Sequence, residues 1–393
     1  MPRLRRDGVT LLIYAQLGVW GYFLYGFGPV VPLLRDEQRV SASVASLHGT
    51  ALAVGAVVAG ALFPALTRRL GRAGALWLAL IGVGVTGTVL CLARALPATL
   101  LATVAVATCG SLLINAVVAT LTAYHGAAGP AAIAEANAVA CGMGVVAPAV
   151  VGLTVRAGLG WRPAIAVVVG LVGLLTVVAL AARIRVPYGV PKAAAVRLVT
   201  PARLPTPYWL AWALLAATGS VEVCASLWAA EVLRGRAGMD AGGAAAALSA
   251  IVAGMFVGRL VGSRLALRMG PVPLMLRALA LSGAGFALFW LATVPWLAVL
   301  GLLVLGLGNA MHYPLGISLA LRAAPGQEDR AAARASYGMA LAFGVSPFVL
   351  GAVADGVGAH RAFLLVPVFL ALAAGLVTPL GRRLPAVPAR APA

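Results

Sequence analysis

Charged side chains are scarce in this sequence. Only 10 % of the 393 residues are Asp, Glu, Lys or Arg, and 62 % are hydrophobic, whereas an average soluble domain carries about a quarter and about half, respectively. This composition excludes an ordinary soluble domain and indicates a chain embedded in a lipid bilayer. The net charge of +19 does not indicate nucleic-acid binding, because the basic residues punctuate apolar runs instead of clustering with polar or aromatic partners.

Several functional motifs are also missing. The four cysteines show neither CxxC nor Cys/His spacing, which excludes a disulfide framework and a zinc site. The absence of a G-x-x-x-x-G-K-[S/T] loop leaves an ATP-driven pump within this chain unsupported. The histidines lack ligand spacing, which argues against an intramembrane enzyme. We therefore expect no enzyme activity, no catalytic residues, no metal and no cofactor; the four histidines are His48, His125, His312 and His360.

Long apolar runs are abundant. Crossing the hydrocarbon core takes about 20 predominantly apolar residues, and the sequence contains twelve runs of that kind. An all-α multi-pass membrane protein is the predicted fold class. The predicted spans are Val9–Leu34, Ser43–Leu66, Ala75–Leu96, Thr99–Ala123, Ala131–Val155, Pro163–Ala182, Trp209–Leu233, Ala241–Leu267, Leu274–Thr293, Pro295–Leu321, Ala331–Val353 and Ala362–Leu380.

The two halves of the chain are repeats of each other. A shift of 199 positions, without a gap, superimposes Arg35 on Arg234, Gly71 on Gly270, Pro148 on Pro347, Gly152 on Gly351 and Arg162 on Arg361. Such a repeat predicts two fused six-helix bundles with a binding site between them near the middle of the membrane. The predicted domains are residues 1–182 and 208–393, joined by a cytoplasmic linker at 183–207 that is rich in Pro and basic residues and has no acidic residue.

The basic residues predict the orientation. With both termini in the cytoplasm, twenty of the 29 Lys and Arg residues lie on the inner side, eight lie on the outer side and Arg259 lies within a helix. Basic loops are retained in the cytoplasm. We therefore expect a multi-pass protein of the cytoplasmic (inner) membrane, working as a monomer.

The loop after the second span resembles the signature of a known family. PALTRRLGRAGAL, from Pro64 to Leu76, resembles the major facilitator superfamily pattern G-x-L-a-D-r-x-G-r-k-x-x-l. Pro64 replaces the first Gly of the pattern and Arg68 replaces its acidic residue. The resemblance implies two pseudo-symmetric six-helix bundles and a secondary active transporter that works by alternating access. Its first, fourth, seventh and tenth helices are expected to line a central cavity.

Two shorter resemblances concern the subfamily. GMGVVAPAVVG, from Gly142 to Gly152, resembles the G-x-x-x-G-P-x-x-G-G motif of proton-driven drug exporters, and GLGNAMHYPLGISLAL in the tenth span resembles fucose-type permeases. Because Pro148 and Gly152 recur in the second half, a bend needed by both halves also explains the first of these motifs. The first resemblance favours proton-coupled export (efflux) of a small organic solute. The second favours proton-coupled uptake of a sugar or organic acid.

Glu222 is the main candidate for proton coupling. It lies about eleven residues from the outer end of the seventh span, and at 1.5 Å per residue this depth is about 17 Å. A carboxylate costs about 2.5 kcal/mol or more in hydrocarbon, so acidic residues inside spans are rare and usually functional. A packing residue that stays protonated is the alternative. His312 is a second candidate proton carrier, since imidazole titrates near physiological pH.

Polar residues on the expected cavity helices are candidates for substrate binding. On the tenth span Asn309, His312 and Tyr313 fall at helical spacing along one stripe. On the fourth span Ser111 and Asn115 share a face, which a packing seam of small residues explains equally well. The predicted substrate-binding residues are Tyr25, Ser111, Asn115, Ser226, Asn309, His312 and Tyr313.

Charged residues near the inner ends of the helices are candidate gates. Glu135 is expected to meet Arg264 or Arg268, although an acid near a helix N-terminus is also stabilised there without a partner. Arg259 is expected either to extend toward the inner surface or to pair with Glu222. The predicted gating residues are Arg69, Arg72, Glu135, Arg259, Arg264 and Arg268.

Overall fold

The computed structural model describes residues 5–125, 128–184, 186, 203–266, 268–325 and 327–384, and the long elements within them are all helices. The apolar composition explains this outcome. A bilayer offers no water to backbone N–H and C=O groups, so a lipid-embedded chain satisfies them within helices.

The first half forms six helices. The predicted first span, Val9–Leu34, is broken at Gly28–Pro29 into two helices. Asp7 caps the first of these helices by accepting from the Thr10 N–H, and Ser41 accepts in the same way from Val44 at the start of the third. The helices are α1 (Gly8–Phe27), α2 (Val30–Gln38), α3 (Ala42–Leu92), α4 (Leu96–His125), α5 (Gly129–Arg156) and α6 (Arg162–Ala181).

The helix α3 contains two of the predicted spans. Its 51 residues would extend about 77 Å if straight, more than twice the thickness of a hydrocarbon core of about 30 Å. The backbone reverses at Gly71, whose φ of 68° and ψ of 176° are not helical and are open to glycine because it has no Cβ. Among the described residues, eleven helical stretches are long and apolar enough to cross a membrane. With α3 holding two spans, they account for the twelve predicted runs.

The second half is broken into more pieces. Its eighth, tenth and twelfth spans are each interrupted, so that two helices make up one span. The helices are α7 (Thr206–Arg236), α8 (Ala241–Ala247), α9 (Ser249–Ala266), α10 (Pro271–Leu291), α11 (Pro295–Asn309), α12 (His312–Arg322), α13 (Glu328–Val357), α14 (Ala359–Ala362) and α15 (Leu365–Arg383).

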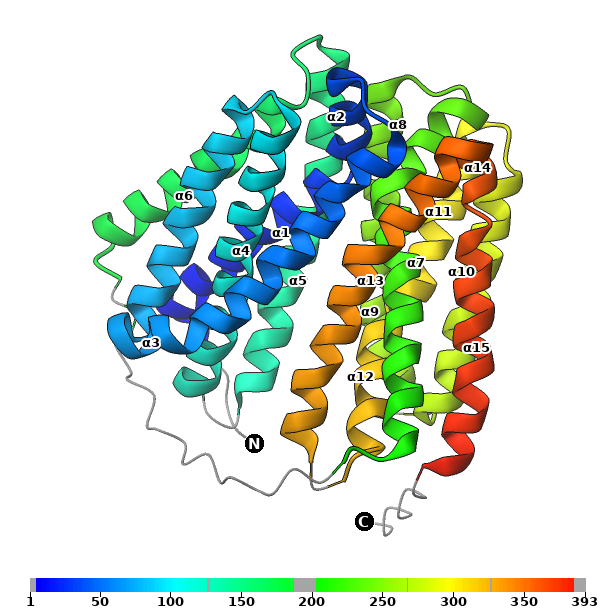
Figure 1. The fold of residues 1–393 in the computed structure, drawn as a ribbon. Coiled ribbons are helices and arrows are strands. Elements are labelled where there is room, and N and C mark those ends of the chain that lie inside the picture. The colour runs from blue at the N-terminus through cyan, green and yellow to red at the C-terminus, as the bar shows by residue number, and fades with distance from the viewer. Residues whose placement is uncertain are drawn as a thin grey trace.

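The helices lie in two groups, α1–α6 and α7–α15, with the start of α1 and the end of α15, the elements nearest the termini, at the same end of the molecule (Figure 1). We call this end the termini side and the opposite end the distal side. The groups contact each other chiefly where α3 packs on α13 and where α5 packs on α8 and α9. Most of the predicted linker, 183–207, lies outside the described residues, so the boundaries 1–182 and 208–393 stay a prediction.

Glycines let the helices within each group approach backbone to backbone. A Cβ at Gly21 of α1 would collide with the Ala140 carbonyl of α5, and one at Gly306 of α11 would collide with the Ile251 carbonyl of α9. Helices in lipid gain little from hydrophobic association, because the lipid tails are equally apolar, and they associate instead through such close contacts between small residues. The glycine positions therefore determine how closely these helices pack.

This packing makes a testable prediction. Replacing Gly306 with Ala should lower the stability of the folded protein by roughly 1–3 kcal/mol, because the added methyl group has no space. Gly283→Ala in α10 is the matched control, since a Cβ there meets no atom within 4 Å. Thermal unfolding in detergent measures both variants. Equal transition temperatures would contradict the packing described.

Candidate functional site

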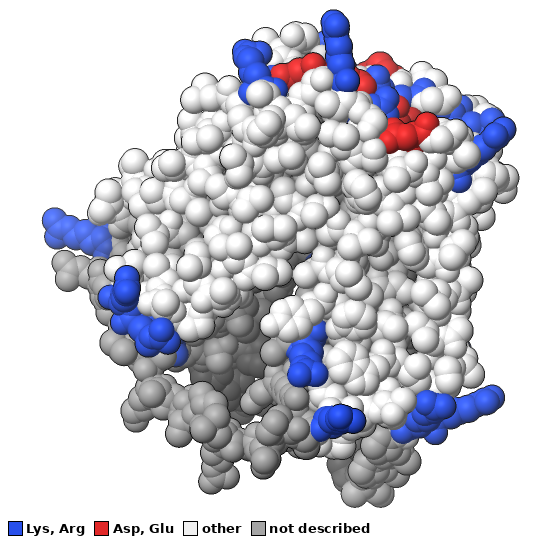
Figure 2. All heavy atoms as spheres, in the orientation of Figure 1, with Lys and Arg blue, Asp and Glu red and all other residues white. Residues whose placement is uncertain are grey.

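A cavity of about 410 Å³ lies between the two groups of helices. Residues of both groups line it, and most of them are apolar or aromatic. The surface is hollowed between the groups on the termini side (Figure 2). The lining residues are Trp20 and Leu24 of α1, Leu52, Ala53 and Ala56 of α3, Ala107, Ser111 and Ile114 of α4, Glu222 of α7, Arg259 of α9, Tyr313 of α12, and Met339, Ala340 and Phe343 of α13.

Among the described lining residues, Glu222 and Arg259 are the charged side chains. They interact electrostatically, but no ion pair joins them among the residues that the structure describes. Glu222 likewise has no hydrogen-bond partner within the described part of the chain. The predicted pair is therefore not formed in this conformation, although both members face the same cavity.

Arg259 is held on its other side by uncharged groups of the first bundle. Its Nη1 atom contacts the Cys141 Sγ atom of α5, and its guanidinium also reaches the Tyr25 hydroxyl of α1. The Tyr25 ring lies so close to Gly144 of α5 that a Cβ there would collide with it. A second hollow of about 480 Å³, lined in part by Asn137, Cys141 and Pro314, shares Arg259 and Tyr313 with the first.

Two predicted binding residues, Asn309 and His312, do not face the cavity. Both are buried against α10, where the Ser282 hydroxyl lies 3.2 Å from Asn309 Oδ1 and 3.3 Å from His312 Nε2. The stripe predicted for the tenth span assumed one continuous helix. The chain instead breaks between the end of α11 and the start of α12, which changes the phase of the helix, so that only Tyr313 lines the cavity.

The other predicted binding residues are divided. Ser111 is part of the cavity lining. Tyr25 is not, but it interacts with the lining residue Arg259. Asn115, one turn beyond Ser111, is half-buried and outside the lining. Ser226 lies one turn from Glu222, where its carbonyl packs so closely on Gly28 that a Cβ there would collide with it. Sequence reasoning missed Trp20, Met339 and Phe343, because apolar residues in an apolar span carry no distinguishing signal.

The predicted gate on the termini side is not assembled in this conformation. Glu135 accepts from Arg6 at 2.6 Å and from the Tyr14 hydroxyl at 3.3 Å, both of its own helix group. It therefore does not meet Arg264 or Arg268. Within the described ranges, neither those two arginines nor Arg69 and Arg72 form an ion pair.

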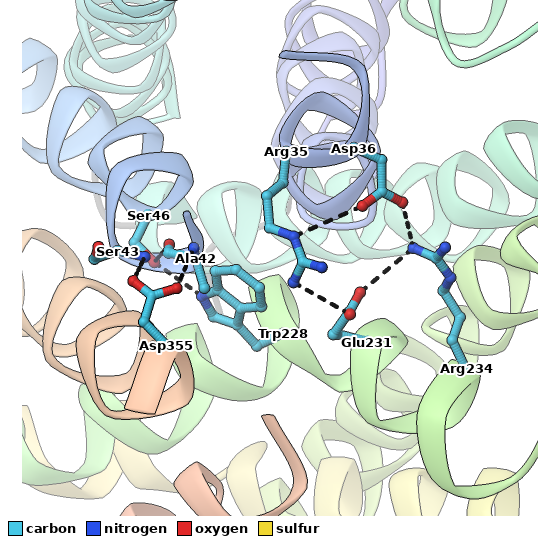
Figure 3. Close-up of polar contacts among 9 residues, drawn as sticks. All are labelled: Arg35, Asp36, Ala42, Ser43, Ser46, Trp228, Glu231, Arg234 and Asp355. Carbon is cyan, nitrogen blue, oxygen red and sulfur yellow. Dashed lines mark hydrogen bonds and ion pairs between the residues drawn. The ribbon is translucent and has the colours of Figure 1, made fainter. Parts of the chain in front are cut away.

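On the distal side, four charged residues join the two groups (Figure 3). Arg35 of α2 lies 3.2 Å from Glu231 of α7, and Arg234 of α7 lies 2.7 Å from Asp36 of α2. The two arginines also contact the acid of their own group, which closes a ring of four residues. Arg35 and Arg234 are superimposed by the 199-residue repeat, so the arginines of the ring follow the symmetry and the acids do not.

Two further contacts, related by the same repeat, flank this ring. Asp355 at the end of α13 accepts from the backbone N–H groups of Ala42 and Ser43 at the start of α3, at 2.6 and 2.9 Å (Figure 3). Its repeat equivalent is Arg156 at the end of α5, which lies 3.0 Å from the carboxylate of Asp240, the residue that caps α8. We call these two contacts the distal clasps. Each joins the end of one helix to the start of a helix in the other group.

The repeated glycines Gly152 and Gly351 lie one turn before the distal clasps. A Cβ at Gly152 would collide with the Gly242 carbonyl of α8, and one at Gly351 would collide with Ser46 and the Ala42 carbonyl of α3. The Ser46 hydroxyl also accepts from the Trp228 indole N–H of α7 at 3.1 Å (Figure 3). The repeat landmarks thus mark the surface where the two groups meet, and this surface is closed on the distal side.

The distal side also holds several paired acidic residues. Half of the 10 acids of the chain lie there, and on the face drawn in Figure 2 the acidic atoms appear only near the distal end. Each of the five has a partner: the ring binds Asp36 and Glu231, the clasps bind Asp240 and Asp355, and Arg162 binds Glu37 at 2.7 Å. The distal side is therefore held together by paired charges.

The ring makes a prediction about conformation. A partly exposed ion pair contributes about 0.2–1 kcal/mol to the stability of the conformation that contains it. The double change Arg35→Ala and Arg234→Ala should therefore raise several-fold the fraction of molecules in which the two groups are separated on the distal side. Spin labels at Leu159 and Trp296, exposed distal residues of the two groups, report the change as longer distances. The double change Arg39→Ala and Arg236→Ala removes the same charge without breaking an ion pair among the residues that the structure describes. An equal effect of both double changes would contradict the role of the ring.

A second prediction concerns pH. The hydrogen bond from Arg156 lowers the pKa of Asp240 to about 2. A carboxyl whose pKa is lowered on pairing keeps that contact above its ordinary pKa and loses it only as the pH falls through the lowered value. The Arg156–Asp240 clasp should therefore stay intact between about pH 5 and 8. In Glu222→Gln, whose cavity carboxyl is removed, the same labels should report an unchanged distal distance over this range, and distal opening within it would contradict the assignment.

Comparisons with known proteins agree with this architecture. The family model for the Major Facilitator Superfamily matches residues 13–325 and, in a second match, residues 220–393. No curated protein matches the chain in sequence.

Solved structures share the fold at low sequence identity. A D-xylose-proton symporter superimposes with a TM-score of 0.80 at 16 % identity, covering 96 % of this chain and 97 % of the other. A peptide transporter gives 0.76 at 14 %, covering 98 % of both chains. A bacterial homologue of the human lysosomal transporter Spinster gives 0.75 at 15 %, covering 95 % and 96 %.

The resemblance read from the signature loop and the predicted fold class are thus confirmed. The match to the family model spans both halves of the chain, as the repeat requires. This chain belongs to the major facilitator superfamily, and it is a multi-pass secondary transporter and not an enzyme.

Proposed function

We propose that this transporter couples the movement of a small organic solute to the movement of protons, with Glu222 as the proton-binding group. The observation that carries the proposal is the position of this carboxyl. Glu222 lines the cavity between the two helix groups, about midway along α7, and no hydrogen bond or ion pair engages it among the described residues. An acid placed in this way within a membrane is a functional group by default.

Alternating access requires two conformations of similar free energy. The present conformation, closed on the distal side and hollowed on the termini side, supplies one of them. Its distal contacts are partly exposed ion pairs, each of modest strength, so they can be broken without a large barrier. We propose that residues 1–182 and 208–393 rock as units about the cavity, and that the monomer is sufficient.

Closing the termini side would bring the start of α5 toward the end of α9. Glu135 would then exchange Arg6 for Arg264 or Arg268, which carry no ion pair among the described residues here. In this chain Arg68 stands where the family signature has its acid, so the loop with Arg69 and Arg72 supplies only positive charge. The negative charge of the proposed gate is therefore that of Glu135 on α5, outside this loop. With both termini in the cytoplasm of a cytoplasmic membrane, the termini side is the inner side.

The motif that favoured export has a packing explanation in this fold. Gly144 accommodates the Tyr25 ring, and Gly152 allows α5 to approach α8. Neither contact depends on the direction of transport. This motif therefore does not decide between export and uptake.

The proposal predicts the behaviour of Glu222→Gln. The amide cannot gain or lose a proton, so accumulation driven by a pH gradient should fall to the level of protein-free liposomes. Exchange of solute across the membrane, which needs no net proton movement, should persist. Liposomes containing the purified protein, with an imposed pH gradient and a panel of sugars, organic acids and lipophilic cations, measure both activities.

Glu37→Gln is the matched control. It removes an acid that Arg162 holds within the first helix group, away from the cavity. Its gradient-driven accumulation should remain close to that of the unchanged protein. Accumulation that is undiminished in Glu222→Gln would refute the role of this carboxyl.

A further inference from the structure

The charges of the cavity are carried by one helix group alone. Among the described lining residues, α1, α3 and α4 supply Trp20, aliphatic side chains and the Ser111 hydroxyl. The second group supplies Glu222, Arg259 and the Tyr313 phenol. A bound solute therefore meets an apolar and aromatic wall on one side and a pair of opposite charges on the other.

The two charges are not equivalent. An arginine side chain stays protonated in proteins, whereas a carboxyl can exchange its proton. The groups that hold Arg259 from the first bundle, Cys141 and Tyr25, are an uncharged thiol and an uncharged phenol, so they do not neutralise it. Within the described part of the chain, the other titratable groups that face Glu222 are these same two side chains and Tyr313. The net charge of the empty cavity is thus zero when Glu222 is ionised and positive when it is protonated.

The charge of a solute decides which cavity states are neutral. A cation leaves an excess positive charge whether Glu222 is ionised or not. A neutral solute leaves the cavity neutral only while Glu222 keeps its charge, and it then carries no proton. A solute with one negative charge balances Arg259 when Glu222 is protonated. An unbalanced charge enclosed within a membrane is costly, so the last combination is the one that pairs a solute with a proton.

Resting on the proposed function, the geometry points to a singly charged organic anion as the substrate, bound at Arg259 and carried together with one proton on Glu222. The closed cavity is neutral in two states, with anion and proton both present or both absent. With only one of them present the cavity carries a net charge. Rocking is therefore limited to the two neutral states, which makes the transport a one-to-one symport that moves no net charge.

The shape of the cavity adds a constraint on the body of the anion. Its volume of about 410 Å³ lies within the range of about 300–1,000 Å³ typical of sites for small organic molecules. Trp20, Tyr313 and Phe343 present aromatic surface to it. A flat apolar body with one acidic group, such as an aromatic acid, fits both the walls and the charge. With a proton gradient directed toward the termini side, such a symport drives uptake, the second of the two directions considered for this chain.

Calorimetric binding of three matched probes tests the inference. Benzenesulfonate carries a negative charge at every relevant pH, phenyltrimethylammonium carries a positive charge, and benzenesulfonamide is the neutral analogue. The purified protein should bind the sulfonate in preference to the other two. Comparison of binding enthalpies in buffers of different ionisation heat should show uptake of about one proton per sulfonate bound. At alkaline pH, where Glu222 is ionised in the free protein, the affinity for the sulfonate should then fall about tenfold per pH unit.

Three variants separate the roles of the two charges. Glu222→Gln should bind the sulfonate without proton uptake and with an affinity independent of pH. Arg259→Gln should lose at least about tenfold in affinity, and Arg259→Lys, which keeps the charge, should retain proton-linked binding. Glu37→Gln should keep the proton uptake of the unchanged protein. A thermal transition recorded for each variant shows that it is folded.

Several results would overturn the inference: preferred binding of the cation or the amide, sulfonate binding without proton uptake, or no sulfonate binding at millimolar concentration. Failure of the proposed function can be distinguished from failure of the anion assignment. If sulfonate binding takes up a proton but a pH gradient does not drive its accumulation in liposomes, proton-coupled transport is wrong and the site stands. If a pH gradient drives a cation or a neutral solute through Glu222, the coupling stands and the anion assignment is wrong.

Discussion

A bilayer interior offers no water to a charged side chain, and this constraint decides where the few acids of the chain lie. Five of them lie on the distal side, each bound to an arginine or to the start of a helix. All of these contacts except Glu37–Arg162 join the two helix groups at that end. The one acid deep within the membrane, Glu222, lines the cavity opposite the arginine Arg259. The distal closure and the proton coupling that we propose for Glu222 both follow from where charge can be accommodated.

The repeat of the sequence has a structural meaning that the residues alone did not disclose. Arg35 and Arg234 form the ring, Gly152 and Gly351 allow the close approach, and Arg156 and Asp355 form the distal clasps. All of these positions are related by the same shift of 199 residues. A symmetric set of contacts closes the distal side, whereas the cavity charges are asymmetric, since both come from the second group. The distal contacts, which we propose to break during rocking, are thus placed symmetrically, and the charged groups that we propose to bind the solute and the proton are not.

The fold could be predicted because the sequence features that indicate it extend over many residues. Twelve apolar runs and a gap-free repeat average over many residues, so errors at single positions do not matter. The site depends on the phase of individual helices, which a sequence gives only if each helix is regular. Glu222, Ser111 and Tyr313 line the cavity, whereas the break between α11 and α12 turns Asn309 and His312 toward α10. The pairing of Glu135 depends on the conformation, and a sequence does not specify which conformation is present.

The central claim is that the carboxyl of Glu222 exchanges a proton within the cavity. Infrared difference spectroscopy of the purified protein in lipid, recorded between acidic and alkaline pH, observes the carbonyl band of a protonated carboxyl directly. We expect such a band at acidic pH, its loss at alkaline pH and its absence from Glu222→Gln. A band assigned to Glu222 that does not change with pH, or a Gln variant with an unchanged difference spectrum, would contradict it.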